Sequence, residues 1–350
     1  MKILIIKQTS LGDVIHSTLA IEAIRKQYPD AELHFMVDRV CALAVESNPH
    51  IDKFFYFDKV SYGKRLKKSW LEFFPLCREV GKILRELRQT KYDLAFDLQG
   101  IERSIFFLYL CRAKRKFVKG NKPLLKGFKN ASKNDHALTE IRGTLKLGGI
   151  ECEEFFPKIY LKKSADFSNK LPAAIQQALV QEDKKLILLS PFTSWVTKDF
   201  PVEAYLRTVE LLRETHADAE FAFVATPDKR DEINTIIKKF SFIEPNTSKH
   251  VHNLAGLTNI QELQVLIDQA NLVIASEGAV GHIASALDTP VCVIFGPTQP
   301  TRVGPWGKNA YVIQSETASC LACYKRKCDK WICMDGLEPQ ICEKSLELLD

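Results

Sequence analysis

The sequence predicts an α/β protein with two doubly wound domains, each built on a parallel sheet. Apolar strand-like runs alternate with amphipathic helical segments, and this alternation restarts after a polar stretch near the middle of the chain. A turn rich in small and polar residues follows the first strand of each round. The length of 350 residues is typical of two domains. Ligands of such folds bind at the carboxyl ends of the strands, and we therefore expect two domains that face each other across a cleft.

The first domain is predicted over residues 1–165. The expected elements, in order, are a strand at Lys2–Ile6, a helix at Val14–Gln27, strands at Glu32–Val37 and Lys53–Phe57, a helix at Trp70–Gln89 and a strand at Asp93–Asp97. The strands are short apolar runs, whereas apolar residues recur every three or four positions in the helices. Residues 163–183 are polar and are expected to form the interdomain linker.

The second domain is predicted over residues 180–330, and a helix at 331–350 is expected to pack back on the N-terminal domain. The elements are strands at Leu186–Ser190 and Glu220–Ala225, helices at Val202–Thr215, Asp228–Phe240 and Ile260–Gln269, and two buried strands, LVIA and VCVIF, within residues 271–307. No run approaches the roughly 18–20 apolar residues of a membrane span, and MKILIIKQ lacks the apolar region of a signal peptide. A cytoplasmic protein is therefore expected.

The positive charge is concentrated in two places. Arg103–Asn134 holds ten Lys and Arg and no acidic residue, although the net charge of the whole chain is only +6. Lys64, Arg65, Lys67 and Lys68 form a second cluster. Such clusters attract nucleic acid, anionic lipid or an acidic glycan, but a solvated mobile loop is equally typical of this composition.

Residues 271–307 have the pattern of an anion-binding site. The strand LVIA is followed by the small-residue turn SEGAVGH, and VCVIF is followed by a Gly-Pro-Thr turn. Free N–H groups at turns and helix starts bind phosphate, although an ordinary βαβ unit with structural glycines has the same pattern.

The turns after the first strand of each domain carry candidate reactive groups. Asp13 and His16 lie three residues apart at a helix start, where Asp13 is either an N-terminal cap or a general base. The second turn, Ser190–Pro201, offers hydroxyls and Lys198, a set that suits a diphosphate unless the lysine is simply solvated.

These segments resemble glycosyltransferase family 9, the ADP-heptose:lipopolysaccharide heptosyltransferases. The resemblance is carried by MKILIIKQTSLGDVIHSTLAIEAIRKQYPDAELHFMV, by TSWVTKDFPVEAY, by residues 253–307 and by the Cys-rich stretch CLACYKRKCDKWICMDGLEP, so it covers nearly the whole chain in order. It implies a GT-B fold of two Rossmann-like domains, and an inverting transfer of heptose from ADP-heptose that needs no cofactor.

The resemblance also assigns roles to residues. Asp13 would be the general base, and Lys198 would neutralise the leaving ADP. Donor-binding residues would be Thr193, Ser194, Lys198, Glu277, Gly278, Ala279, His282, Gly296, Pro297 and Thr298, although His282 could also be a structural histidine. Ser10, Gly12, Lys64, Arg65 and Arg103 would bind an anionic glycolipid acceptor at the inner face of the membrane. Members commonly have Asp, then Ser or Thr, then Gly where this chain has Glu277, Gly278 and Ala279, and we expect its handling of the donor to differ from theirs at this triplet.

Four closely spaced cysteines near the C-terminus are a candidate metal site. Cys320, Cys323, Cys328 and Cys333 have a spacing that could hold structural zinc or iron, or they are reduced thiols in a packed segment. Three alternatives to a lipopolysaccharide heptosyltransferase remain: another nucleotide-sugar enzyme of the same fold, a transferase with a protein acceptor, and a metal-stabilised nucleic-acid-binding protein. The last is disfavoured, and no nucleic acid is expected as partner, because aromatic residues are not interleaved with the basic stretch.

Overall fold

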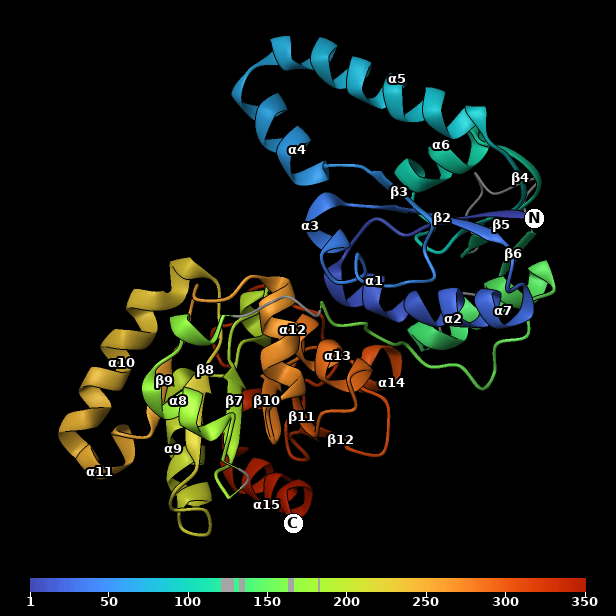
Figure 1. Ribbon diagram of the computed structural model, residues 1–350. Coiled ribbons are helices and arrows are strands. Elements are labelled where there is room, and N and C mark those ends of the chain that lie inside the picture. The colour runs from blue at the N-terminus through green and yellow to red at the C-terminus, as the bar shows by residue number, and fades with distance from the viewer. Residues whose placement is uncertain (121–128, 132–135, 163–166, 182) are drawn as a thin grey trace. The chain divides into compact units, whose positions relative to one another are not determined.

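The computed structural model describes residues 1–120, 129–131, 136–162, 167–181 and 183–350. The chain divides into two compact units, Met1–Tyr160 and Leu161–Asp350 (Figure 1). Each unit is a parallel six-stranded sheet with helices packed on it, so the α/β, GT-B prediction with two Rossmann-like units is confirmed.

The sheet of the first unit has the strand order β3-β2-β1-β4-β5-β6. Its strands are β1 (Lys2–Ile6), β2 (Glu32–Val37), β3 (Lys53–Tyr56), β4 (Lys91–Asp97), β5 (Arg112–Lys119) and β6 (Lys129–Ala131). Its helices are α1 (Leu11–His16), α2 (Thr18–Gln27), α3 (Arg39–Ala42), α4 (Lys59–Lys68), the short 3-10 turn η1 (Trp70–Glu72), α5 (Phe73–Gln89), α6 (Glu102–Leu110) and α7 (Ala137–Gly148). The strand order reverses between β1 and β4, and this switch point is where such sheets bind ligands.

The sheet of the second unit has the order β12-β11-β10-β7-β8-β9, which is the same topology. Its strands are β7 (Leu186–Ser190), β8 (Glu220–Phe223), β9 (Val251–Asn253), β10 (Leu272–Ser276), β11 (Val291–Phe295) and β12 (Ala310–Gln314). Its helices and 3-10 turns are η3 (Ser168–Lys170), α8 (Ala173–Ala178), η4 (Val196–Lys198), α9 (Val202–Arg213), η5 (Pro227–Lys229), α10 (Arg230–Ile243), α11 (Pro245–Ser248), α12 (Ile260–Asp268), α13 (Ala279–Ala286), α14 (Pro300–Val303), η6 (Ile332–Met334) and α15 (Glu338–Leu349). Its switch point lies between β7 and β10.

The predicted helix Val14–Gln27 is two helices in the structure. Helix α1 ends at His16 and α2 begins at Thr18, so Ser17 separates them. The Ser17 hydroxyl donates to the carbonyl of Val14 at 2.6 Å, a local bond of the kind that competes with the helical pattern. The break leaves α1 as a single short turn that carries Asp13.

The basic stretch is partly a strand rather than a loop. Strand β5 pairs with β4 and β6, and its Phe117 and Val118 are buried. Lys114 pairs with Asp93 at 2.7 Å, and Lys119 pairs with the buried Glu140 at 2.9 Å, so these charges are matched within the unit. Lys122, Lys126 and Lys133 lie outside the described residues.

The expected linker and the expected final helix both belong to the second unit. Helix α8 lies inside the predicted linker and packs on β8, with Ile175 fully buried. Helix α15 packs on α9 and on β10, β11 and β12. Within the described residues, no helix is both long enough and apolar enough to cross a bilayer.

Candidate active site

Asp13 lies in α1, directly after the turn that follows β1. Ser10 stands just before this helix, and its backbone N–H and its hydroxyl donate to Oδ2 of Asp13 at 3.2 and 2.9 Å. The N-terminal cap of α1 is therefore Ser10, and Asp13, the third residue of the helix, accepts from it as in a capping box rather than being the cap itself. The side chain of Asp13 is nevertheless 40% exposed, so the carboxylate is accessible from solvent although both of its oxygens have partners.

A buried lysine holds the Asp13 carboxylate in its ionised form. Lys7 is the first residue after β1, its side chain is 2% exposed, and its Nζ lies 3.4 Å from Oδ1 of Asp13. Burial alone would raise the pKa of Asp13, but the charges of Lys7, His16 and Lys119 and the Ser10 hydroxyl outweigh burial and hold this pKa well below its usual range. Asp13 can accept a proton only transiently, as a base that acts while a bond forms.

The loop after β4 fastens the Asp13 turn from the neighbouring strand. The side-chain oxygen of Gln99 accepts from the backbone N–H groups of Gln8 and Thr9 at 3.2 and 3.0 Å. Asp97 is fully buried and accepts from the N–H groups of Gln99 and Gly100, while burial raises its pKa to about 6. The turn is thus held by side chains about 90 residues away in the sequence.

The predicted acceptor residues fall into two groups. Arg103 lies beside the Asp13 turn, because its Nε donates to the side chain of Gln8 at 2.5 Å, and Ser10 and Gly12 belong to the turn itself. Arg65 instead lies in α4 and pairs with Glu72 and Glu79 at 2.8 and 2.9 Å, and Lys64 is exposed on the same helix. The structure therefore brings Ser10, Gly12 and Arg103 to Asp13, whereas the guanidinium of Arg65 is already matched by two carboxylates.

In the second unit, Lys198, Glu277 and Thr298 converge at the switch point. Lys198 ends η4, Glu277 follows β10, and Thr298 follows β11. One oxygen of Glu277 lies 2.5 Å from the Lys198 ammonium and accepts from the Thr298 hydroxyl at 2.7 Å. The ammonium also lies 4.9 Å from the centre of the Trp195 ring. The structure thus brings together three residues that the sequence assigned to the donor site.

The start of α13 completes this cluster. Gly278 stands just before the helix in an extended conformation, and Ala279 begins it, so the replacement of the family's Gly by Ala costs no left-handed backbone here. His282 is buried and stacks on Trp306, with ring centres 5.8 Å apart. Thr193 bonds through its N–H to Asp199 at 2.7 Å, while Ser194 is exposed.

The Cys-rich segment, residues 320–333, packs against both loops that the sequence predicts to bind the donor. The carbonyl of Lys325 accepts from the Thr197 hydroxyl at 2.6 Å, and the N–H of Tyr324 donates to the carbonyl of Pro297 at 2.8 Å. A Cβ at Gly296 would lie 2.5 Å from Cε of Met334 and 3.1 Å from Sγ of Cys333, so the segment packs closely on this glycine. The segment thus supports the loops that carry Lys198 and Thr298, a role that the sequence did not reveal.

The predicted metal site does not match the described geometry. Cys320, Cys323 and Cys328 are half-buried thiols and Cys333 is buried. In the part of the chain that the structure describes, no three His, Cys, Asp or Glu side chains are arranged to hold a metal ion. We therefore assign no chemical step to a metal at this segment.

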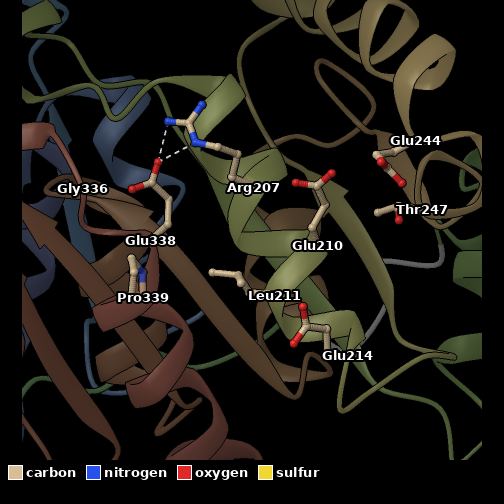
Figure 2. Close-up of a pocket in the computed structure, with 9 residues that line it drawn as sticks. All are labelled: Arg207, Glu210, Leu211, Glu214, Glu244, Thr247, Gly336, Glu338 and Pro339. Carbon is tan, nitrogen blue, oxygen red and sulfur yellow. Dashed lines mark hydrogen bonds and ion pairs between the residues drawn. The ribbon is translucent and has the colours of Figure 1, made fainter.

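A further groove of the second unit lies outside the predicted site. Figure 2 shows it between α9, α11 and the start of α15, with a volume of about 710 Å³. Four glutamates line it, of which Glu338 pairs with Arg207, and it contains none of the residues predicted for the donor site.

Sequence and structure comparisons identify the family. The model of glycosyltransferase family 9 (heptosyltransferase) matches residues 80–331. A lipopolysaccharide core heptosyltransferase, OpsX, of Haemophilus influenzae is 24% identical over 324 residues, which cover 90% of this chain and 85% of that protein. Lipooligosaccharide heptosyltransferase 2 of Haemophilus ducreyi is 26% identical, over 90% of this chain and 88% of its own. The solved structure of ADP-heptose lps heptosyltransferase II of E. coli has the same fold, with a TM-score of 0.73, 17% identity, and coverage of 100% of this chain and 98% of that one. This chain is therefore a glycosyltransferase and belongs to glycosyltransferase family 9 (heptosyltransferase).

Proposed function

We propose that this enzyme transfers heptose from ADP-heptose to a hydroxyl of the lipopolysaccharide inner core, with inversion at the anomeric carbon. The proposal rests on two groups at the switch points of the sheets: the ionised, part-exposed carboxylate of Asp13 in the first unit, and the ammonium of Lys198 in the second. Relatives named as lipopolysaccharide heptosyltransferases support the choice of donor and acceptor.

In the proposed reaction, the acceptor hydroxyl attacks the anomeric carbon while the bond from that carbon to the diphosphate breaks. Asp13 takes the hydroxyl proton as the new bond forms, which suits a carboxylate whose pKa is low. Lys198, with the backbone N–H groups at the start of α13, neutralises the charge on the departing ADP. Such a single displacement requires the acceptor hydroxyl with Asp13 and the leaving diphosphate with Lys198 to lie on opposite faces of the sugar.

Lys198 takes the part that a divalent cation plays in other enzymes, so we propose that turnover needs no added metal. The proposed setting is cytoplasmic, with peripheral contact at the inner membrane where an anionic glycolipid acceptor is available. Turnover that is unchanged by EDTA is the expected result, and a loss that Mg²⁺ restores would contradict this part of the proposal.

A panel of nucleotides and nucleotide sugars tests the donor. ADP should raise the melting temperature and UDP should not, and ADP-heptose should be consumed in the presence of an inner-core acceptor. Protection by UDP alone would instead indicate another nucleotide-sugar enzyme of the same fold.

A further inference from the structure

Helix α4, the turn η1 and the start of α5 expose a contiguous group of large apolar side chains. Trp70 is 72% exposed, Leu71 60%, Phe73 53% and Phe74 66%. Isolated exposed apolar residues are ordinary, but four within five positions form a patch of the kind that marks an interaction surface.

Exposed cations surround this patch. Lys64, Lys67 and Lys68 of α4 lie on one side of it, and Arg78, Lys82 and Arg85 follow along α5. Residues 59–89 contain nine Lys and Arg but only three Glu. Two of these carboxylates, Glu72 and Glu79, are bound to Arg65, so they do not offset the outer lysines. We call these ten exposed apolar and cationic side chains the elbow surface.

The remaining side of α5 is fixed to the first unit. Leu76, Val80, Ile83 and Leu84 pack against the core around the buried Leu87. Spacings of three and four residues place these side chains on one face of the helix, and Phe74, Arg78, Lys82 and Arg85 on another. The apolar face of α5 is therefore fixed to the core, and the face with Phe74, Arg78, Lys82 and Arg85 is directed elsewhere.

We propose that the elbow surface docks on an anionic lipid bilayer, an inference that rests on the proposed function because a glycolipid acceptor is presented at a membrane. Trp and Phe rings enter the headgroup region, where amphipathic aromatic residues concentrate. The neighbouring lysines pair with acidic headgroups, and each contributes roughly fivefold to binding. A single-stranded nucleic acid would require aromatic rings spaced along a cationic groove, whereas here the rings are contiguous.

The test measures flotation of the full chain with vesicles made of equal amounts of phosphatidylglycerol and phosphatidylcholine, without donor or acceptor. The unaltered chain should float with these vesicles, and much less with phosphatidylcholine alone. The double variants Lys67→Glu/Lys68→Glu and Phe73→Ser/Phe74→Ser should each reduce binding at least tenfold. Because no turnover is measured, a failure of the proposed reaction would leave this result intact.

Helix α10 offers a matched control. It carries the adjacent exposed cations Lys238 and Lys239, and the exposed pair Phe242 and Ile243. Lys238→Glu/Lys239→Glu and Phe242→Ser/Ile243→Ser should leave flotation within twofold of the unaltered chain. Equal losses from both helices would overturn the assignment to the elbow surface. Equal affinity for DNA and for vesicles, lost with the lysines but kept without the aromatic rings, would assign the surface to nucleic acid instead.

Discussion

Replacement of Asp13 by Asn separates the two roles of this side chain, the chemical and the structural. The amide oxygen of Asn can still accept from Ser10, so the cap of α1 should survive. The negative charge beside Lys7 is lost, and with it the group that accepts the proton of the acceptor. We expect turnover to fall by roughly 10²–10⁴, the usual contribution of a general base, while the affinity for ADP is unchanged.

The cost in stability follows from the geometry of the Lys7–Asp13 pair. Two unit charges 3.4 Å apart attract by about 5 kcal/mol at an effective dielectric constant of about 20. Because Asp13 is 40% exposed, water screens this attraction, and we expect a loss of about 1–2 kcal/mol in the free energy of unfolding. Urea denaturation of the native chain and of Asp13→Asn measures this difference.

Lys7→Met distinguishes chemistry from folding. Methionine fills the buried site of Lys7 without a charge, so the double variant Lys7→Met/Asp13→Asn should recover the stability that Asp13→Asn loses, and should remain inactive. Lys7→Met alone should keep turnover at pH 7 within about tenfold, since a carboxyl with the ordinary pKa of about 3.9 is still ionised there. Turnover of Asp13→Asn within tenfold of the native chain would refute the role of Asp13, and an inactive Lys7→Met would transfer that role to the lysine.

Three other predictions concern charge and backbone. Lys198→Ala should weaken ADP binding by about tenfold and lower kcat. Glu277→Gln frees the Lys198 ammonium from its ion pair and should tighten ADP binding, as measured by calorimetry. Changes of the same sign in both variants would contradict a competition between Glu277 and the diphosphate for Lys198. Gly100→Ala should lower the free energy of unfolding by about 3 kcal/mol, because φ of Gly100 is +66° and the new Cβ would lie 2.0 Å from a backbone oxygen. Gly149→Ala should lower it by only about 1 kcal/mol, because φ of Gly149 is +83° but its Cβ would meet open space. Equal losses would refute the steric argument. Burial raises the pKa of Asp97 to about 6, so its contribution to stability is greatest below about pH 4 and is lost as the pH rises through about 6. Asp97→Asn should therefore remove a pH-dependent loss of about 3 kcal/mol in the free energy of unfolding. An unchanged pH profile in urea titrations would show that Asp97 is not the cause.

The strands that the sequence predicts best are those buried on both faces. Lys2–Ile6, Glu32–Val37 and Leu186–Ser190 match the structure to the residue, because a continuous apolar run between two layers of helices has few alternatives. Strand β5 was missed since most of its residues are cationic, and two of these cations have carboxylate partners in other elements, Asp93 and Glu140. Charge pattern alone could not reveal these partners.

Residues of the candidate site could be predicted from the sequence where the reactive side chain lies in a single turn after a strand. Asp13 and Lys198 each follow a first strand within one short segment, so local sequence was enough to suggest them. Gln99 was missed, because its importance appears only when β4 lies beside β1 and carries its loop to the Asp13 turn. Lys7 was missed although it adjoins this turn, because the sequence does not show that its side chain is buried. The contacts of residues 320–333 with the loops that carry Lys198 and Thr298 were missed for a similar reason, because they join segments that are distant in the sequence.

The candidate residues of the two units share one arrangement, a lysine paired with a carboxylate, but the burial of the two partners differs. Each contains a lysine paired with a carboxylate after strands at the switch point, Lys7 with Asp13 and Lys198 with Glu277. In the first unit the lysine is 2% exposed and the carboxylate 40%, which fits the proposed role of Asp13 as a base. In the second unit both partners are largely buried, the carboxylate at 7% and the lysine at 16%, and the lysine is the group proposed to meet the diphosphate. In each pair, the more exposed partner is thus the one to which we assign the chemical role. The longer side chain of Glu277 suits this arrangement, since one carboxylate oxygen reaches both the Lys198 ammonium and the Thr298 hydroxyl.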